Sequence, residues 1–317
     1  MNFKGKKGWL KGYSSLEKKN FLFVGLLLLF PLAQFAVFYL AVNIESFKYA
    51  FTDETGKASL KYLKMIFDEF SAQGNDNLWR VLLRSFITWC VGNLVVFPVS
   101  IIFTYALFKK VPGEMFFRVL FFLPGIIGTV VLASIYRQLV TINGPLQKFL
   151  EEVLKIDLGV QIRKLGFLDY DKTSFLMVLI FGVWCSLGGN VVVLTGAVTR
   201  IPPDIFEYGK IEGVGVWREF FNVVLPLILP TVSTLFIFSL AGIFTADSGT
   251  FLLFSEDYNG AAKTMGYLIF MLSYNVSRGV EVANRPAALG LVVTVATFPI
   301  VLTVRFLIEK FTDDVEF

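Results

Sequence analysis

The sequence contains no histidine, only two cysteines and few charged residues for its length. Histidine is the commonest general acid–base residue near neutral pH and a principal zinc ligand, so its absence excludes His-dependent catalysis and His-based zinc sites. The cysteines, Cys90 and Cys185, each lie inside an apolar run, which gives neither a disulfide framework nor a thiolate cluster. A phosphate-binding loop of the form G-x-x-x-x-G-K-S/T is also missing, so the chain does not bind ATP in that way.

Apolar residues dominate what is present. Hydrophobic residues make up 55% and charged residues 17% of the 317 positions, whereas soluble domains carry about a quarter charged residues. The 35 phenylalanines provide bulk for lipid-facing and packing surfaces, and the 26 glycines allow close contacts between helices. We therefore expect the chain to lie in a lipid bilayer, and we expect no nucleic-acid partner.

Six stretches without charge are long enough to cross a membrane, which takes roughly 20 apolar residues per helix. They lie between Lys19 and Glu45, Arg84 and Lys109, Arg118 and Arg137, Lys172 and Arg200, Glu219 and Asp247, and Arg285 and Arg305. The runs are continuously apolar and lack the two-residue alternation of a barrel strand. The sequence thus predicts an all-α polytopic membrane protein with six transmembrane helices. Prolines in or at the edge of these windows predict kinks, at Pro31, Pro98, Pro124, Pro230 and Pro299.

Basic residues predict the orientation. The first 19 residues hold six lysines against one acid, Glu17, and Lys109 and Lys110 follow the second window. Because lysine and arginine accumulate on the cytoplasmic side, we expect both termini in the cytoplasm. The first apolar run is much longer than the roughly 7–15 residue core of a signal peptide, so we interpret it as an uncleaved anchor.

The same charges divide the chain. We expect a basic cytoplasmic tail over residues 1–20, a first anchor helix over 21–44, an external loop over 45–83 and a cytoplasmic tail over 311–317. Further external segments are expected near 138–171 and 248–284. None of these segments is large enough for an independent catalytic domain.

A polar element over residues 200–222 interrupts the apolar chain. Pro202 and Pro203 end what precedes it, Asp204 is a candidate helix N-cap, and Gly213 is suited to the turn because glycine adopts positive φ at no steric cost. The segment VWREFFNVVLP then leads back into the membrane. The pattern predicts a helix–turn–helix hairpin that fits a socket on another protein.

This hairpin resembles the signature loop of permease subunits of binding-protein-dependent ABC importers. The family has Glu-Ala-Ala, then Asp-Gly-Ala, an aromatic region, Leu-Pro and a later Pro. The corresponding residues here are Glu207-Tyr208-Gly209, Glu212-Gly213-Val214, Phe220, Leu225-Pro226 and Pro230. Tyr208 and Gly209 replace the two alanines. The stretches LTGAVTRIPPDIF and NRPAALGLVVTV, together with Trp217, are similar to the carbohydrate-uptake branch of that family.

The resemblance implies a type I ABC importer permease fold, with residues 84–310 as its core. It also implies a prokaryotic plasma-membrane protein that imports a sugar or oligosaccharide by alternating access. The implied partners are a second homologous permease, two cytoplasmic ATPase subunits and an extracellular or periplasmic solute-binding protein. ATP and Mg would bind to the ATPase subunits, so this chain would be neither an enzyme nor the holder of a cofactor or metal. The implied coupling residues are Glu207, Tyr208, Gly209, Glu212, Gly213 and Pro226.

Four polar residues in or next to the apolar windows are candidates for the solute pathway, namely Asn93, Asn190, Thr245 and Asp247. Such groups either line a pathway or tie helices together. Three other functions remain to be considered. A permease of the same family for a non-carbohydrate solute differs only in its specificity, whereas a membrane enzyme needs a titratable cluster at one membrane face. A secondary transporter needs inverted repeats and internal ion-binding acids, which the sequence does not show.

Overall fold

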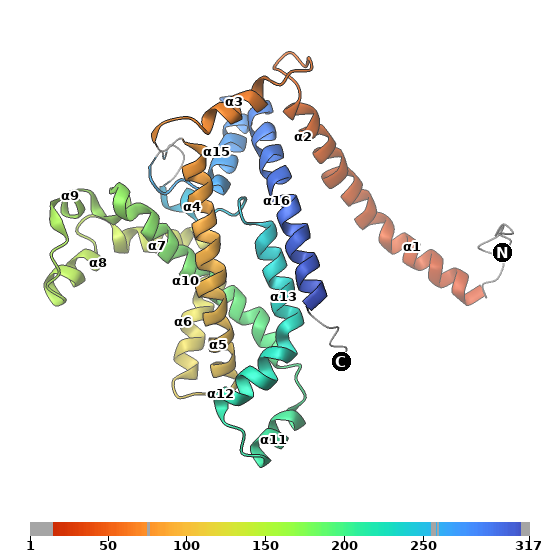
Figure 1. Cartoon of the computed structure of the whole chain (residues 1–317), viewed down its shortest axis with the longest axis vertical. Coiled ribbons are helices and arrows are strands. Elements are labelled where there is room, and N and C mark those ends of the chain that lie inside the picture. The colour runs from red at the N-terminus through yellow and green to blue at the C-terminus, as the bar shows by residue number, and fades with distance from the viewer. Residues whose placement is uncertain (1–14, 75–76, 255–257, 259, 312–317) are drawn as a thin grey trace.

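The computed structural model describes residues 15–74, 77–254, 258 and 260–311 of the chain. Most of these residues form helices that run along one long axis (Figure 1). Within the described ranges the only β-structure is an isolated bridge between Thr52 and Ala58. The expected tails lie largely outside these ranges, because residues 1–14 and 312–317 are not described.

The first half of the chain supplies the first span, a short helix after it, and a long helix followed by a bent pair. Its elements are α1 (Ser15–Phe35), η1 (Ala36–Ala41), α2 (Val42–Ala50), α3 (Lys61–Glu69), α4 (Leu78–Val91), η3 (Gly92–Val96), α5 (Phe97–Phe108), α6 (Glu114–Ile126), α7 (Thr129–Val140), α8 (Pro145–Lys148) and η4 (Phe149–Val153), where η marks π-helical segments.

The second half supplies three long helices and the hairpin between two of them. Its elements are α9 (Gly159–Asp169), α10 (Asp171–Val198), α11 (Pro203–Ile211), α12 (Val216–Glu219), η5 (Phe220–Val224), α13 (Leu225–Ala241), α14 (Thr250–Phe254), α15 (Met265–Ser277) and α16 (Asn284–Phe311).

Five helical stretches in the described part of the chain are long and apolar enough to cross a bilayer. They are Phe23–Ala50, Leu78–Phe108, Asp171–Val198, Val216–Ala241 and Asn284–Ile308. Several extend beyond the charge-free windows, so that the expected external loop over 45–83 loses residues to α2 at one end and to α4 at the other.

The third expected span is not one straight helix. The chain bends by 113° between the helix Glu114–Ile126 and the helical stretch Thr129–Val153. The number of candidate spans in the described residues reaches six only when this bent pair is counted as one span. Ile127, between them, has extended backbone angles (φ −82°, ψ 134°). Pro124, three residues earlier, lies inside α6, where its missing N–H leaves the Leu120 carbonyl without its helical partner, so the last turns of this helix are weakened before the break.

Two of the π-helical segments inside the long helices lie just before a proline. The π-helical segment η3 directly precedes Pro98 in α5, and η5 directly precedes Pro226 in α13. A proline ring displaces the carbonyl four residues before it, and a wider turn accommodates this displacement. The expected irregularities are present next to Pro98, which follows η3, and shortly after Pro124, whereas Pro31, Pro230 and Pro299 lie inside the continuous helices α1, α13 and α16.

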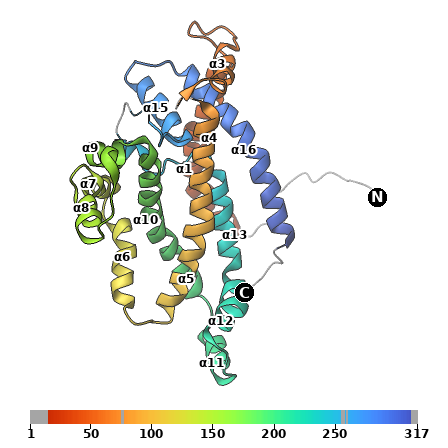
Figure 2. The same cartoon turned by 60° about the vertical axis from the view of Figure 1, so that its left-hand side comes forward.

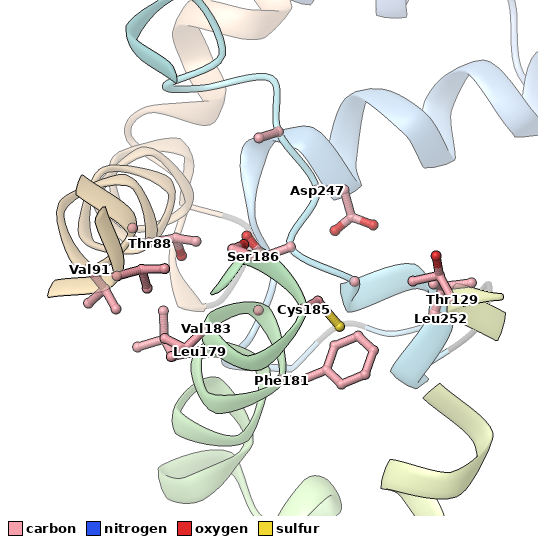
Figure 3. Close-up of a pocket in the computed structure, with 16 residues that line it drawn as sticks. Thr88, Val91, Thr129, Leu179, Phe181, Val183, Cys185, Ser186, Asp247 and Leu252 are labelled. Atoms are coloured by element: carbon pink, nitrogen blue, oxygen red, sulfur yellow. The ribbon is translucent and has the colours of Figure 1, made fainter. Parts of the chain in front are cut away.

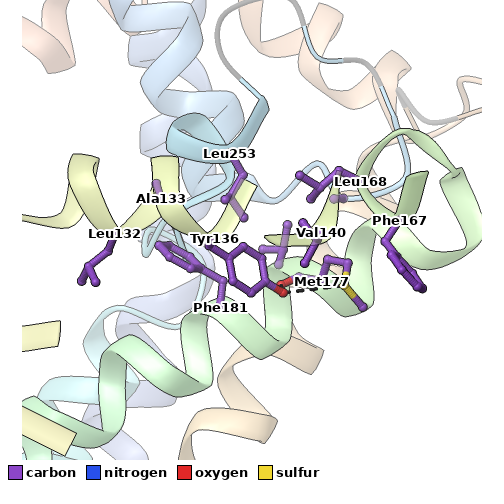
Figure 4. Packing of buried hydrophobic residues seen from close by; sticks show 11 residues of the cluster. Leu132, Ala133, Tyr136, Val140, Phe167, Leu168, Met177, Phe181 and Leu253 are labelled. Atoms are coloured by element: carbon purple, nitrogen blue, oxygen red, sulfur yellow. Dashed lines mark hydrogen bonds between the residues drawn. The ribbon is translucent and has the colours of Figure 1, made fainter. Parts of the chain in front are cut away.

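Three apolar clusters hold the bundle together. The first joins α7, α9, α10 and α14, where the Tyr136 hydroxyl donates a hydrogen bond to the Met177 carbonyl at 2.8 Å (Figure 4). The second joins α3, α4, α15 and α16 at the opposite end of the molecule from α11. The third, which we call the hairpin cluster, contains Phe97, Ile101, Tyr105, Leu194, Val198, Ile201, Phe206, Phe220, Val224 and Ile228.

The first span stands apart from the bundle. α1 leans away from the other helices, and its continuation α2 packs on α16 (Figure 1). None of the most apolar window of this span is buried within the chain. At the top of the junction, the side-chain amide of Asn284 donates to the carbonyl of Thr52 at 2.9 Å and to that of Tyr49 at 3.1 Å. The anchor is thus tied to α16 at one end and otherwise presents apolar side chains outward.

Candidate coupling hairpin and solute cavity

The polar element folds as the predicted hairpin, at the far end of the molecule from α3 and α15 (Figures 1 and 2). Helix α11 ends in a tight turn in which Gly213 adopts φ +68°. The Val214 N–H donates to the Gly209 carbonyl at 2.9 Å and the Gly213 N–H to the Lys210 carbonyl at 3.2 Å. This pair of bonds is the Schellman arrangement, which requires a left-handed residue at the position of Gly213.

The expected N-cap at Asp204 is wrong. The cap position is Pro202, and Pro203 occupies the first turn of α11. Proline fits this position because its φ is preset and its missing N–H would have no helical partner there. Asp204 lies in the first turn instead, where its negative charge is favourable near the positive end of the helix dipole.

The hairpin has an outward and an inward face. Tyr208, Ile211 and Trp217 are 68%, 81% and 66% exposed, and Glu207 and Glu212 are exposed beside them. Phe206 and Phe220 are buried in the hairpin cluster. Large apolar side chains exposed at the tip of a structure mark an interaction surface.

The remaining predicted coupling positions fit the same geometry. Gly209 is half-buried, and a Cβ added there would lie 4.0 Å from Cβ of Val214, so the family's alanine would fit. Pro226 is the second residue of α13, which follows η5, and it is exposed. Sequence reasoning missed Glu219, which is buried and forms an ion pair with Lys109 at 2.5 Å. The two residues lie 110 positions apart, so no local pattern links them.

A cavity of about 310 Å³ opens between α4, α10 and the loop that follows α13 (Figure 3). Its lining is Thr88, Val91, Gly92, Val96, Thr129, Leu179, Phe181, Gly182, Val183, Cys185, Ser186, Ala246, Asp247, Ser248, Gly249 and Leu252. Hydroxyl groups come from four of these residues and a carboxylate from one, and none of the lining residues is cationic.

Asp247 provides the single carboxylate of this cavity. Its Oδ1 accepts a hydrogen bond from the Thr250 N–H at 3.1 Å, and its Oδ2 lies 3.4 Å from the Phe251 nitrogen. The surrounding protein raises the pKa of Asp247 above its ordinary value, although the backbone N–H groups of Phe251 and Thr250 act in the opposite direction. The side chain is reached by solvent through the cavity, so the carboxylate is available to a ligand there.

Two glycines hold the loop that carries Asp247. Gly249 adopts φ +89°, and a Cβ at this position would lie 2.6 Å from the ring of Phe181. On the other side, a Cβ at Gly266 of α15 would lie 2.5 Å from the Ala246 carbonyl and 2.7 Å from the Asp247 nitrogen. The loop is therefore packed between α10 and α15 with no space for an added side chain at either contact.

The other predicted pathway residues lie elsewhere. Asn93 donates from its side-chain amide to the Ser239 hydroxyl, and neither Asn190, half-buried in α10, nor Thr245, exposed after α13, lines the cavity. Thr88 and Ser186 line it but were not singled out, because isolated hydroxyl residues are common in apolar helices. Within the described ranges, no group of three or more His, Cys, Asp or Glu side chains is placed to hold a metal ion.

The chain combines helices long and apolar enough to cross a membrane, a protruding hairpin at one end, and a small cavity with four hydroxyl groups and one carboxylate among apolar side chains. This combination indicates a helical membrane component of a transport system. The family model for the inner membrane component of binding-protein-dependent transport systems matches residues 76–316. The chain belongs to this family, and it is accordingly a multi-pass inner-membrane protein.

Curated relatives carry the names of sugar permeases. The multiple sugar-binding transport system permease protein MsmF of Streptococcus mutans is 23% identical over 78% of this chain and 83% of its own length. The diacetylchitobiose uptake system permease protein NgcF of Streptomyces coelicolor is 24% identical over 89% and 80%. The arabinooligosaccharides transport system permease protein AraP of Bacillus subtilis is 22% identical over 91% and 88%.

Solved structures show the same fold. A chain of a bacterial ABC transporter that imports the acidic polysaccharide alginate superposes with a TM-score of 0.75 at 18% identity, covering 95% of this chain and all of that one. A second structure of an alginate transporter, in complex with a periplasmic protein bound to an alginate pentasaccharide, gives the same TM-score over 93% and 96%. At this identity the likeness establishes the fold alone.

Proposed function

We propose that this chain is one permease subunit of an ABC importer and forms half of a pathway for a sugar or oligosaccharide. The observation that carries the proposal is the hairpin, whose glycine turn and exposed apolar face stand at the end of a membrane bundle. The names of the curated relatives support a saccharide as the solute.

The missing phosphate-binding loop and the exposed hairpin together suggest which partners the chain would need. Because the sequence has no phosphate-binding loop, the energy would come from two cytoplasmic ATPase subunits that hold ATP and Mg and receive the hairpin. A second, homologous permease would complete the pathway, and a solute-binding protein would deliver the saccharide to the end formed by α3 and α15. Glu207, Tyr208, Glu212 and the turn at Gly213 would contact the ATPase subunits.

The cavity supports a pathway completed by a second chain. Its volume of about 310 Å³ lies at the lower end of the roughly 300–1,000 Å³ of ligand pockets. Hydroxyls from Thr88, Ser186 and Ser248 and the carboxylate of Asp247 are suited to the hydroxyl groups of a saccharide. With one acid and no cation among its lining residues, the cavity favours an uncharged saccharide over an acidic one.

Alternating access would follow from movement of the hairpin. When ATP closes the ATPase subunits, the hairpins move with them, and the two permease bundles rotate so that the cavity opens outward. This mechanism requires the hairpin in the cytoplasm, the α3 end outside, and both termini in the cytoplasm. Cysteines at the exposed positions Lys57 and Lys210 test the orientation in intact cells. We expect an impermeant maleimide to label Lys57→Cys only; labelling of Lys210→Cys would contradict the proposal.

The function is tested with the complete complex in proteoliposomes. ATP hydrolysis is measured with the solute-binding protein and a panel of neutral oligosaccharides, uronate oligosaccharides, amino acids and phosphate. We expect stimulation by a neutral oligosaccharide. Stimulation by an amino acid or phosphate alone would assign the chain to a permease for a different solute.

A further inference from the structure

A buried ion pair joins the end of α5 to the second half of the hairpin. Lys109 Nζ lies 2.5 Å from Glu219 Oε1, and the two side chains are 23% and 5% exposed. Lys109 is the residue that ends α5, and Glu219 is the last residue of α12. The pair therefore connects two helices that are remote in sequence.

Neighbouring side chains extend this contact to both helices of the hairpin. The Tyr105 hydroxyl lies 3.1 Å from Glu219 Oε1 and 3.1 Å from the Val216 carbonyl, so it donates to one or the other. The Lys109 ammonium lies 5.4 Å from the ring centroid of Phe206 in α11 and 5.7 Å from that of Tyr105. A single lysine of α5 thus contacts α11 through Phe206 and α12 through Glu219.

The apolar contacts at this junction already hold the hairpin against the bundle. The ring centroids of Phe108 and Phe206 are 4.9 Å apart, and those of Tyr105 and Phe220 are 5.1 Å apart. A buried ion pair adds little net stability, because the cost of removing both charges from water offsets their attraction. The ion pair instead fixes the relative position of the two helices. A charge-assisted hydrogen bond has a defined geometry and resists movement of one helix along the other, whereas packed rings tolerate small displacements.

The helix that ends at Lys109 also forms a wall of the cavity. α4, η3 and α5 form one continuous stretch, Leu78–Phe108, and this stretch contributes Thr88, Val91 and Val96 to the cavity lining. A displacement of the hairpin that moves Lys109 along its helix axis would therefore move one wall of the cavity.

We propose that the Lys109–Glu219 pair is the positioning contact that transmits hairpin movement to the span Leu78–Phe108. This inference rests on the coupling role assigned to the hairpin under the proposed function. The pair lies on the inward face, away from Tyr208 and Trp217, so it would act after the ATPase subunits have bound and not in binding them.

The test replaces each partner without changing its shape. Glu219→Gln and Lys109→Met remove one charge each, and Glu114→Gln is the matched control because the Glu114–Arg118 pair, also at 2.5 Å, lies within the single helix α6. The measurement is the amount of solute taken up per ATP hydrolysed in proteoliposomes, with the saccharide that most strongly stimulates the wild-type complex. We expect both variants to retain their ATPase subunits and to lose at least about fivefold in this ratio, the lower limit of typical coupling between sites.

A second measurement does not depend on the solute. In a Cys90→Ser, Cys185→Ser background, Ser186→Cys in the cavity is labelled with a water-soluble maleimide, with and without ATP and vanadate. We expect the labelling rate to change with nucleotide in the parent and to stay constant with Glu219→Gln added. The exchanged pair, Lys109→Glu with Glu219→Lys, should restore the change in labelling.

Three results would overturn the inference. They are an unchanged uptake ratio in both single variants, an equal loss in the Glu114→Gln control, or dissociation of the ATPase subunits on Glu219→Gln, which would make the pair a docking element. A wild-type complex that no saccharide stimulates would instead contradict the proposed function, and the labelling experiment would still decide the role of the pair.

Discussion

The side-chain amide of Asn93 donates a hydrogen bond to the hydroxyl of Ser239 at 2.7 Å and joins η3 to α13. The same amide also donates to the Trp89 carbonyl one turn earlier, at 2.9 Å. Asn93 is buried, its side-chain nitrogen bonds to its own helical stretch and to α13, and the residue does not line the cavity. Of the two roles that the sequence left open for this residue, the geometry favours joining helices.

We therefore expect Asn93→Leu to lower the stability of the complex by about 0.6 kcal/mol, and at most about 1.7, the range measured for such bonds between membrane helices. The half-maximal solute concentration for ATPase stimulation should not change. Thermal unfolding measures the loss of stability, and a solute titration of the ATPase activity measures the half-maximal concentration. Ser239→Ala should give a similar loss, and the double variant should lose less than the sum because one bond is removed in both. A shifted half-maximal concentration at unchanged stability would place Asn93 in the pathway.

The hairpin turn is expected to tolerate a side chain at one glycine and not at the other. Gly213 has φ +68°, and nothing lies within 4 Å of an added Cβ, so Gly213→Val is costly through backbone strain of about 1–3 kcal/mol and not through collision. Gly215, two residues later, has φ −69° and ψ 154°, which any residue adopts. Gly213→Val should lose uptake or its ATPase subunits, and Gly215→Val should retain both. Equal uptake by the two variants would show that the turn geometry does not matter.

Glu207 lies on the outward face of α11 and is exposed in this chain. If it meets the ATPase subunit, Glu207→Ala should weaken the attachment by about 2–5 kcal/mol, the cost of removing one member of a desolvated charged contact. Co-purification of the ATPase subunits at increasing salt measures this. Glu152→Ala, an exposed acid of η4, serves as the control and should bind the ATPase subunits normally. Equal retention in both variants would remove Glu207 from the interface.

Asp247 should give solute binding a dependence on acid pH. Because desolvation by the surrounding protein raises the pKa of Asp247 above the ordinary 3.8, the carboxylate becomes protonated at a higher pH than an aspartate in free solution. As the pH falls through this raised pKa, the carboxylate loses an acceptor for saccharide hydroxyls, so the half-maximal solute concentration should rise. Asp247→Asn should raise this concentration at neutral pH and should not show the further rise in acid. An identical acid response in wild type and variant would exclude Asp247 from solute binding.

The same shift predicts the sign of a stability effect. A carboxyl group whose pKa is raised by folding contributes stability below its unfolded pKa and loses that contribution as the pH rises through its folded pKa. At pH values above the folded pKa of Asp247, the Asp247→Asn variant should therefore be more stable than wild type, as measured by thermal unfolding in detergent. The difference should shrink as the pH falls.

Close backbone contact at α15 predicts a steric effect. A Cβ at Gly266 would lie 2.5 Å from the Ala246 carbonyl, whereas a Cβ at Gly290 in α16 has no neighbour within 4 Å. Gly266→Ala should destabilise the complex by about 1–3 kcal/mol and displace the loop with Asp247. Gly290→Ala should be neutral or slightly stabilising because alanine favours helix. Similar melting temperatures for the two variants would contradict the contact.

Most of the fold can be predicted from the sequence because a bilayer imposes one main requirement on a segment that crosses it. The segment must be a helix without charged residues that is long enough to span the hydrocarbon core. Five of the six charge-free windows accordingly lie in long helical stretches of the structure. The third does not, because the absence of charge does not determine whether a helix continues in one direction. After the break at Ile127, α7 packs against α10, a contact between segments that are remote in sequence. Helix ends were also displaced, because Glu45 and Arg84 continue helices beyond the windows that they bound.

The site was only partly predictable. The hairpin could be found because its turn needs local residues at fixed spacing, above all Gly213. The Lys109–Glu219 pair and the cavity hydroxyls of Thr88 and Ser186 depend on contacts between remote segments and on the rotation of each helix about its axis. A charge-free window determines neither, so the sequence could name Asn93, Asn190 and Thr245 as candidates for the solute pathway but could not show that only Asp247 of the four candidates lines the cavity.

The loop held between Gly249 and Gly266 limits how the solute preference of this chain can diverge during evolution. A side chain at Gly249 would collide with Phe181, and one at Gly266 would collide with the backbone of Ala246 and Asp247. The walls contributed by α4 and α10 carry no such restriction, because Thr88 and Ser186 project from regular helices into open space. Descendants of this chain that accept new solutes should therefore differ first by single exchanges on those two helices, with the length of the loop preserved.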